Sequence, residues 1–121
     1  MIAALIVAMM LVESGGNPNA IGDGGRALGV LQIHAGVVAD VNRHHGTNYK
    51  HEDALDPVKA KKICRLYLKV YAPAGASPEI LARIWNGGPS GHLKPATQKY
   101  WNKVRAIHQN ERVKPKEGGG R

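Results

Sequence analysis

The first apolar run of the chain has no polar face over most of its length. A helix over residues 2–14 would be apolar all round, and such a helix belongs in the middle of a domain. Gly15, Gly16 and Pro18 end this run. The segment 15–29 is rich in Gly, Asn and Asp, which favours tight turns or a short hairpin over a helix. The first part of the chain therefore predicts a buried helix followed by an irregular, Gly-rich segment.

A second apolar pattern begins directly after the Gly-rich segment. Residues 30–43 carry apolar side chains at spacings typical of a helix, so we expect a second helix there. Residues 44–55 are polar and show no clear period. They predict an irregular connection to the next helix.

Two short sequences mark the beginnings of further helices. Asp56-Pro57 and Ser77-Pro78 each combine an N-cap residue with a proline at the first helical position. A last helix is expected over roughly 96–109. Its apolar face has the helical spacing i, i+1, i+4, i+7 and consists of Tyr100, Trp101, Val104 and Ile107.

Together these elements fit one domain. A chain of 121 residues is long enough for one hydrophobic core but not for two. We expect a mainly α fold of the α+β type, with about five helices around the buried N-terminal helix and a small Gly-rich β or turn segment. The domain is expected over residues 1–109. Residues 110–121 are basic and end in Gly-Gly-Gly-Arg, so we expect a flexible tail there.

The charge balance narrows the choice of partners only in part. The chain has 17 Lys and Arg against 9 Asp and Glu, a formal net charge of +8. Such a surface attracts nucleic acid, anionic lipid or the phosphate-rich polymers of a cell envelope, and it also favours solubility in general. The chain has no helix-turn-helix, RNA-binding or zinc-finger signature. We therefore expect anionic envelope polymers as partners and no nucleic acid.

The number of cysteines limits the possible disulfides, and the opening apolar run limits the possible membrane segments. The single cysteine, Cys64, excludes an intramolecular disulfide and falls on the apolar side of a predicted helix, so we expect a buried thiol. The opening run is shorter than the roughly 20 residues that span a bilayer, and it lacks the basic region and cleavage site of a signal peptide. We expect no integral membrane segment, with any export signal upstream or absent, and a monomer.

Two carboxyl groups follow each other where the first apolar run ends. Glu13 closes the predicted helix, where desolvation and the negative end of the helix dipole both raise the pKa of a carboxyl group. An acid that stays protonated near neutral pH can protonate a glycosidic oxygen. By position alone, a first polar residue that merely reaches solvent is the favoured interpretation.

Asp23 lies in the Gly-rich segment, between Gly22 and Gly24. The glycines predict an exposed, polar turn in which this carboxyl group stays ionised. A protonated and an ionised carboxyl group in contrasting environments is the arrangement that glycoside cleavage uses. An aspartate that bonds the backbone of its own turn is the alternative, and the pair alone does not decide between them.

Other side chains that could take part in binding or catalysis are less clearly marked by the sequence. Trp85 and Asn86 end a predicted helix at a Gly-Gly-Pro turn, where an aromatic ring could stack on a sugar; by default they are a core residue and a helix-end residue. The six histidines do not follow a zinc-ligand spacing, and no phosphate-binding loop or serine-nucleophile motif is present. We expect neither a metal nor a cofactor.

Three ordered motifs carry a family resemblance. Glu-Ser-Gly-Gly-Asn-Pro at residues 13–18, with Gly-Val-Leu-Gln-Ile at residues 29–33, resembles the lysozyme-like superfamily, whose lytic transglycosylases carry Glu-Ser and Gly-Leu-Met-Gln-Ile elements. Ala-Arg-Ile-Trp-Asn-Gly-Gly-Pro at residues 82–89, Pro-Ala-Thr at 95–97 and Tyr-Trp-Asn-Lys-Val at 100–104 resemble the invertebrate-type (destabilase) lysozymes. The resemblance covers roughly residues 5–108, and the lack of disulfides indicates a bacterial or phage relative.

The resemblance implies a lysozyme-like fold with a groove for peptidoglycan. It implies that Glu13 is the general acid and that Asp23 corresponds to the second carboxylate of invertebrate-type lysozymes. The remaining positions that it implies for substrate binding are Ser14, Gln32, Trp85, Asn86, Gly87 and Tyr100.

The function expected from these observations is a muramidase that hydrolyses the β-1,4 bond between N-acetylmuramic acid and N-acetylglucosamine, and so a bacteriolytic enzyme. Lytic transglycosylation by Glu13 alone, with a 1,6-anhydro product, is the alternative. A non-catalytic wall-binding module is a further one. An enzyme of this kind acts on the cell wall, so it is expected to be secreted, periplasmic or released by a phage.

Overall fold

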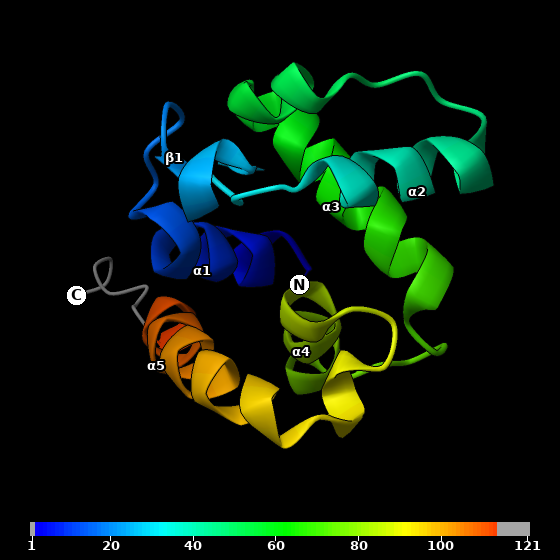
Figure 1. Cartoon of the computed structure of the whole chain (residues 1–121). Coiled ribbons are helices and arrows are strands. Elements are labelled where there is room, and N and C mark those ends of the chain that lie inside the picture. The colour runs from blue at the N-terminus through cyan, green and yellow to red at the C-terminus, as the bar shows by residue number, and fades with distance from the viewer. Residues whose placement is uncertain (1, 114–121) are drawn as a thin grey trace.

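The protein is mainly helical in the computed structural model, which describes residues 2–113, with side-chain environments for residues 2–110 (Figure 1). The α-helices of this part of the chain are α1 (Ile2–Ser14), α2 (Ala35–His45), α3 (Pro57–Tyr71), α4 (Pro78–Gly87) and α5 (Gln98–Val113). Two two-residue strands, β1 (Ile21–Gly22) and β2 (Ala27–Leu28), form an antiparallel hairpin. Short 3-10 helices fill the connections: η1 (Asp23–Gly25), η2 (His51–Leu55), η3 (Gly91–Leu93) and η4 (Pro95–Thr97). The predicted mainly α fold is confirmed.

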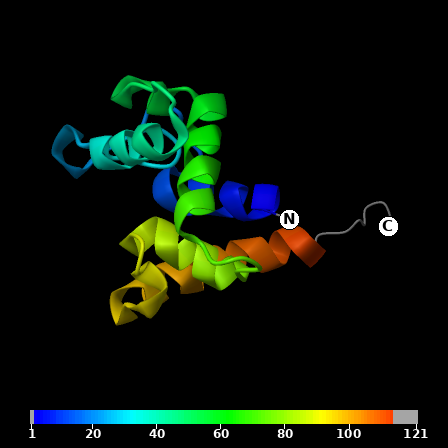
Figure 2. The same ribbon diagram turned by 90° about the vertical axis from the view of Figure 1, so that its right-hand side faces the viewer.

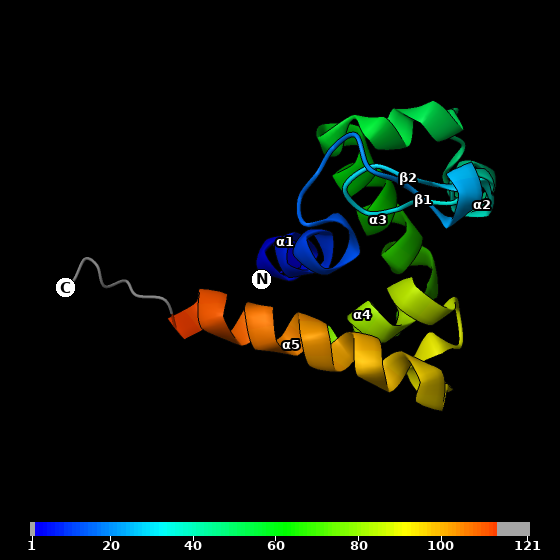
Figure 3. The same cartoon turned by 60° about the vertical axis from the view of Figure 1, so that its left-hand side comes forward.

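Helix α1 lies at the centre and packs along α5 and against α4 (Figure 3). Leu5, Ile6 and Met9 are almost completely buried, as the all-apolar sequence predicts. The prediction of complete burial is wrong for one face, because Val7 and Leu11 are each 40% exposed. The neighbouring elements of this small domain do not surround α1 completely.

The remaining elements form two lobes. The hairpin, α2 and η2 lie beside α3, and α4, η3, η4 and α5 lie below its C-terminal end (Figure 2). Helix α3 contacts α2 and η2 in the first lobe and α4 in the second, so it joins the two. Ile63 and Cys64 on α3 are completely buried, and the predicted buried thiol is confirmed.

The predicted helix starts are confirmed in atomic detail. The Asp56 carboxylate accepts hydrogen bonds from the amides of Val58 (2.9 Å) and Lys59 (3.4 Å) at the beginning of α3. The Ser77 hydroxyl accepts one from the Ile80 amide (3.3 Å) at the beginning of α4. Each cap satisfies backbone donors that have no partner inside the helix.

The segment predicted as a second helix begins later than expected. Residues 30–34 form a buried turn closed by an antiparallel bridge between Leu28 and Ile33, and α2 begins only at Ala35. The apolar side chains of this turn are buried although its backbone is not helical. Their spacing along the sequence is therefore the same as that of a buried helix face. Gly29 has a φ of 78°, and a Cβ there would lie 1.9 Å from the Ala54 carbonyl oxygen. Only glycine allows the turn to approach η2 this closely.

Two other boundaries differ from the predictions. The segment 44–55 ends in the short helix η2 and is thus not wholly irregular. Helix α5 continues to Val113, four residues into the segment expected as a basic tail, while residues 114–121 lie outside the described part of the chain. No helix of the described residues combines the length and the apolar character needed to cross a membrane.

Candidate active site

A cleft of about 460 Å³ lies between the two lobes. Helices α1 to α4 and the hairpin with its neighbouring turns supply its lining residues. Glu13 comes from the end of α1, Asp23 from the hairpin, His34 from the residue before α2, Tyr67 from α3 and Trp85 from α4. The two acids singled out in the sequence therefore line the same cavity.

Glu13 is held in an apolar environment at the end of α1. Burial raises the pKa of its carboxyl group from 4.5 to about 7, and interactions with the side chains of Tyr100 and Trp85 offset part of this rise. A large part of the Glu13 population is thus protonated at neutral pH. The carboxyl group combines a place in the cleft with the proton that a general acid must donate.

Tyr100 lies behind Glu13 and does not line the cleft. Its hydroxyl group is buried and forms no hydrogen bond of standard geometry within the described residues, yet it acts on the Glu13 carboxyl group closely enough to lower the pKa of that group. Burial and Glu13 both raise the pKa of Tyr100, and the same two causes raise the pKa of Cys64. Tyr100 and Cys64 are therefore buried close enough to Glu13 to interact with it, and both remain neutral.

Asp23 has the opposite environment. Its side chain is 48% exposed, and its carboxylate pairs with Arg26 (Nη2 to Oδ1, 3.0 Å) and with His34 (Nε2 to Oδ2, 3.3 Å). The Arg26 guanidinium lowers the pKa of Asp23 from 3.8, and His34 adds to this effect. Asp23 is therefore ionised at neutral pH, while Glu13 retains its proton in part.

Gln32 lines the cleft but also holds the hairpin in place. Its side-chain amide donates to the carbonyl oxygens of Gly29 (3.1 Å) and Ala20 (3.3 Å). Its amide oxygen lies against Gly22, where a Cβ would come within 2.3 Å of it. The Gly-x-x-Gln-Ile element thus fixes the base of the strand that leads to Asp23.

Trp85 and Asn86 line the opposite wall of the cleft, next to Gly88. The ring of Trp85 meets the ring of Tyr67 edge to face, with centroids 5.6 Å apart. Asn86 is exposed. This wall offers an aromatic surface and an amide, which are suited to a sugar ring and its acetamido group.

Ser14 and Gly87 belong to the motifs but are not among the lining residues. The Ser14 hydroxyl donates to the carbonyl oxygens of Val30 (2.8 Å) and Met10 (3.2 Å), so it ties the end of α1 to the buried turn. A Cβ on Gly87 would lie 2.5 Å from the Thr97 methyl group, and the Gly87 carbonyl oxygen accepts a hydrogen bond from Lys94 (2.7 Å). Both residues are engaged in positioning the cleft walls.

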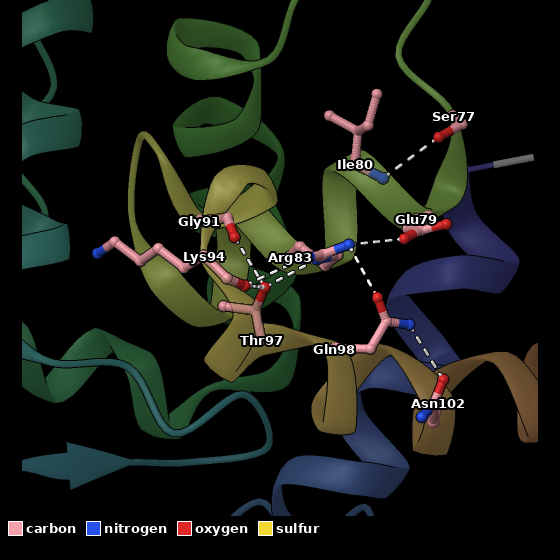
Figure 4. Close-up of polar contacts among 9 residues, drawn as sticks. All are labelled: Ser77, Glu79, Ile80, Arg83, Gly91, Lys94, Thr97, Gln98 and Asn102. Atoms are coloured by element: carbon pink, nitrogen blue, oxygen red, sulfur yellow. Dashed lines mark hydrogen bonds and ion pairs between the residues drawn. The ribbon is translucent and has the colours of Figure 1, made fainter.

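Arg83 connects the motif at residues 82–89 with the Pro-Ala-Thr motif at residues 95–97 (Figure 4). Its guanidinium donates to Thr97 Oγ1 (2.8 Å), Glu79 (2.7 Å), Gln98 (3.1 Å) and the Lys94 carbonyl oxygen (3.0 Å). Thr97 in turn donates to the carbonyl oxygens of Gly91 and Lys94. The Ala-Arg-Ile and Pro-Ala-Thr motifs therefore form a clamp that holds the α4 wall of the cleft.

Two aromatic or polar side chains of the cleft, those of His34 and Tyr67, were not identified from the sequence. Tyr67 follows the apolar spacing of α3 and was indistinguishable from a core residue. His34 is one of six histidines, and nothing in its spacing singles it out. Among the described residues no group of His, Cys, Asp and Glu is placed to hold a metal ion.

A larger cavity, of about 570 Å³, lies at the other end of α1, between Ile2, Ala76, Leu81 and His108. Its lining is otherwise apolar and contains no carboxyl group. The chemistry is therefore concentrated in the smaller cleft, where an acid that is partly protonated and a carboxylate that is fully ionised occupy one cavity.

Comparison with known proteins agrees with this geometry. The transglycosylase SLT domain family matches residues 2–108. The lysozyme of Magallana gigas is 42% identical over 62 residues, which make up 49% of this chain and 44% of that lysozyme, so the chain spans less than half the length of this curated relative. Two solved structures, Aeromonas hydrophila PliI in complex with Meretrix lusoria lysozyme and inhibitor-bound lysozyme from Meretrix lusoria, each match with a TM-score of 0.72 and 32% identity. Each match covers 86% of this chain and 88% of the other.

Proposed function

Since the chain belongs to the transglycosylase SLT domain family of the lysozyme-like superfamily, we propose that it is a muramidase. Its reaction is hydrolysis of the β-1,4 bond between N-acetylmuramic acid and N-acetylglucosamine in peptidoglycan. Glu13 is the general acid and Asp23 is the second carboxylate.

The contrast between the two carboxyl groups of the cleft carries this proposal. Burial brings the pKa of Glu13 to about 7, whereas the Arg26 guanidinium keeps the pKa of Asp23 below its ordinary value. Glycoside cleavage needs one carboxyl group that can give a proton and one that remains an anion. A module that only binds glycans has no use for the buried, partly protonated acid.

In the proposed reaction Glu13 gives its proton to the glycosidic oxygen while the bond from that oxygen to the anomeric carbon breaks. Positive charge develops on the sugar ring, and the carboxylate of Asp23 stabilises it. A water molecule then adds to the anomeric carbon and returns a proton to Glu13. Trp85 and Asn86 on the opposite wall are suited to orient the sugar, since they supply a ring and an amide.

Lytic transglycosylation is the second candidate, and one observation favours it. Both carboxylate oxygens of Asp23 already have partners, Arg26 and His34, which compete with a reacting sugar. If Asp23 stays bound to them, Glu13 acts alone and a hydroxyl group of the substrate itself attacks the anomeric carbon. The product is then a 1,6-anhydro sugar.

The partner in either reaction is the glycan strand of the cell wall. The site of action is therefore outside the cytoplasmic membrane, in a secreted, periplasmic or phage-released enzyme.

Clearing of purified cell walls by the wild type, Glu13→Gln and Asp23→Asn tests the proposal, with the masses of the released muropeptides measured afterwards. Glu13→Gln is expected to lose about 10²-fold or more of the rate, the usual size of general acid catalysis. The wild type is expected to release hydrolysed sugars, one water heavier than anhydro products.

Glu52→Gln is the matched control, because Glu52 is an exposed acid of η2 outside the cleft. Its rate should equal that of the wild type. An unchanged rate in Glu13→Gln removes Glu13 from the mechanism. Anhydro products alone, together with an active Asp23→Asn variant, would replace hydrolysis by transglycosylation.

A further inference from the structure

Helix α3 carries a row of positive charges that the proposed reaction does not use. Its sequence contains Lys59, Lys61, Lys62, Arg65 and Lys69 and no acidic residue. Lys59 pairs with Asp53 (3.3 Å). Within the described part of the chain the other four take part in no ion pair.

Three of these cations follow one face of the helix. Lys62, Arg65 and Lys69 are exposed and stand at the spacing i, i+3, i+7. At 1.5 Å per residue the row extends for about 10 Å along the helix axis. Tyr67, which lines the cleft, points to the other side of α3, since five residues separate its direction from that of Lys62 by about 140°.

Two adjoining cavities lie along this row and meet at Arg65. One, of about 300 Å³, is lined by Lys61, Lys62 and Arg65 together with Ala3 and Val7 of α1. The other, of about 450 Å³, is lined by Arg65 and Lys69 together with Ile2 of α1 and the segment 72–76. We call these two cavities the α3 groove. One of its walls is basic and the other is apolar.

The charges of the groove and of the cleft are opposite. The cleft is lined by the carboxyl groups of Glu13 and Asp23 and by no lysine or arginine, whereas the α3 groove is lined by lysine and arginine and by no acid. An anionic ligand is therefore attracted to the groove and not to the cleft. A bound ligand would leave the cleft open, because the groove lies on a different face of α3.

We propose that the α3 groove binds a linear polymer of alkyl phosphodiesters, such as a poly(glycerol phosphate). Its phosphates pair with Lys62, Arg65 and Lys69, whose row along one helix matches a chain of regularly spaced anions. Its carbon segments lie on the apolar wall formed by Ile2 and Val7. The groove is thus a second binding site, which tethers the enzyme to an anionic envelope polymer.

The lining of the groove argues against other occupants. Neither cavity has an aromatic side chain, so nothing there stacks on the bases of a single-stranded nucleic acid. A second copy of the chain would bring one basic row against another, which repels. A bilayer is disfavoured because the apolar wall lies inside a concave groove and lacks the aromatic residues of a membrane interface.

The test uses lipid-free poly(glycerol phosphate), labelled at one end, and binding measured by fluorescence anisotropy at 50 mM and higher salt. The groove variant is Lys62→Glu/Arg65→Glu/Lys69→Glu. The control variant, Lys99→Glu/Lys103→Glu/Arg105→Glu, reverses two lysines and one arginine that are exposed on α5, so both variants change the net charge equally. Circular dichroism and thermal unfolding establish that each variant is folded.

The groove variant is expected to bind at least about tenfold more weakly than the wild type, and the control less than threefold more weakly. The slope of log affinity against log salt should be about −2 for the wild type, as expected for three phosphate contacts on a flexible strand. Cleavage of soluble peptidoglycan fragments should be the same in the groove variant and the wild type, and binding should persist in Glu13→Gln, so failure of the proposed function leaves this test intact.

Equal weakening in both variants overturns the proposal, because binding then follows net charge and not the groove. So does displacement of the polymer at equal phosphate concentration by single-stranded DNA or by vesicles of anionic phospholipid, which would indicate a general polyanion site or a lipid site.

Discussion

The two walls of the cleft are built in different ways. The α4 wall is held by Arg83, whose side chain is only 13% exposed and donates to four partners across α4, η4 and α5. The hairpin wall consists of two two-residue strands, and its Asp23–Arg26 pair is at the surface, with Arg26 74% exposed. Asp23 itself has a φ of 51°, and the two glycines that follow it, Gly24 and Gly25, also have positive φ.

This difference between the walls parallels the different environments of the Glu13 and Asp23 carboxyl groups. Glu13 sits where α1 meets the firmly held lobe, and its raised pKa depends on a fixed, dry environment. Asp23 is exposed and its carboxylate pairs with Arg26 and His34. The cleft thus contains one acid that is partly protonated and one that is ionised.

The largest expected effect is a loss of protein stability when the α4 wall of the cleft loses Arg83. Arg83→Met leaves Glu79, Thr97 and the Lys94 carbonyl oxygen without their shared donor, and should lower the free energy of unfolding by about 3 kcal/mol. Urea unfolding followed by circular dichroism measures this loss.

Arg26→Met is the matched change in the hairpin wall. The free energy of unfolding should hardly change, because exposed ion pairs contribute little. Equal losses in the two variants would mean that the walls do not differ in the way described.

A second effect, of similar size, concerns how stability depends on pH. The pKa of Glu13 is higher in the folded protein (about 7) than its ordinary value of 4.5, so the folded state binds more protons between these values. Its contribution to stability is therefore lost as pH rises from about 4.5 to 7. Glu13→Gln should remove this loss and make the protein more stable above pH 7, by up to about 3 kcal/mol.

Asp23→Asn is the comparison for this effect. The pKa of Asp23 is lowered in the folded state, so its contribution is present above pH 3.8 and disappears as the pH falls further. Asp23→Asn should bring no gain in thermal stability at pH 8. A gain as large as that of Glu13→Gln would contradict the contrast between the two environments.

The smallest effect is a shift in the pH dependence of the rate. The rate should decline above about pH 7 as Glu13 loses its proton. Tyr100 lowers the pKa of Glu13, so Tyr100→Phe should move this decline to higher pH, with a much smaller loss of maximal rate than in Glu13→Gln. Rates measured from pH 5 to 9 on soluble peptidoglycan fragments would reveal the shift.

Tyr49→Phe removes a hydroxyl group from a residue outside the cleft lining and should leave the pH profile unchanged. A decline that stays at the same pH in Tyr100→Phe would mean that Tyr100 does not affect the pKa of Glu13.

Local sequence signals predicted the helices well where a cap or a stop residue was present. Asp56-Pro57 and Ser77-Pro78 begin α3 and α4 as expected, since a cap depends on neighbouring residues only. The buried turn at residues 30–34 was predicted as helix, because periodic burial looks the same whether the backbone is helical or not. The left-handed conformation of Gln32 and the bridge from Leu28 to Ile33 depend on contacts with other segments.

The site residues likewise divide into those that the sequence singled out and those that only the fold revealed. Glu13 and Asp23 were singled out by their places at the end of an apolar run and among glycines, together with the family motifs around them. The two cleft residues that were missed, His34 and Tyr67, look like any other histidine and any other core residue until α2 and α3 are placed beside the hairpin. Motif residues such as Gly87 and Arg83 were visible as a pattern, but the pattern gave no indication that they position the wall.

The sequence alone determined the apolar central helix and most helix starts, because each depends on residues a few positions apart, and it singled out the two acids together with the family motifs. Only the tertiary structure decided that these acids share a cleft and that one is dry and the other paired. It also placed the cations of α3 on the opposite face. A pKa depends on every group within a few ångströms, and folding brings most of those groups from distant parts of the chain.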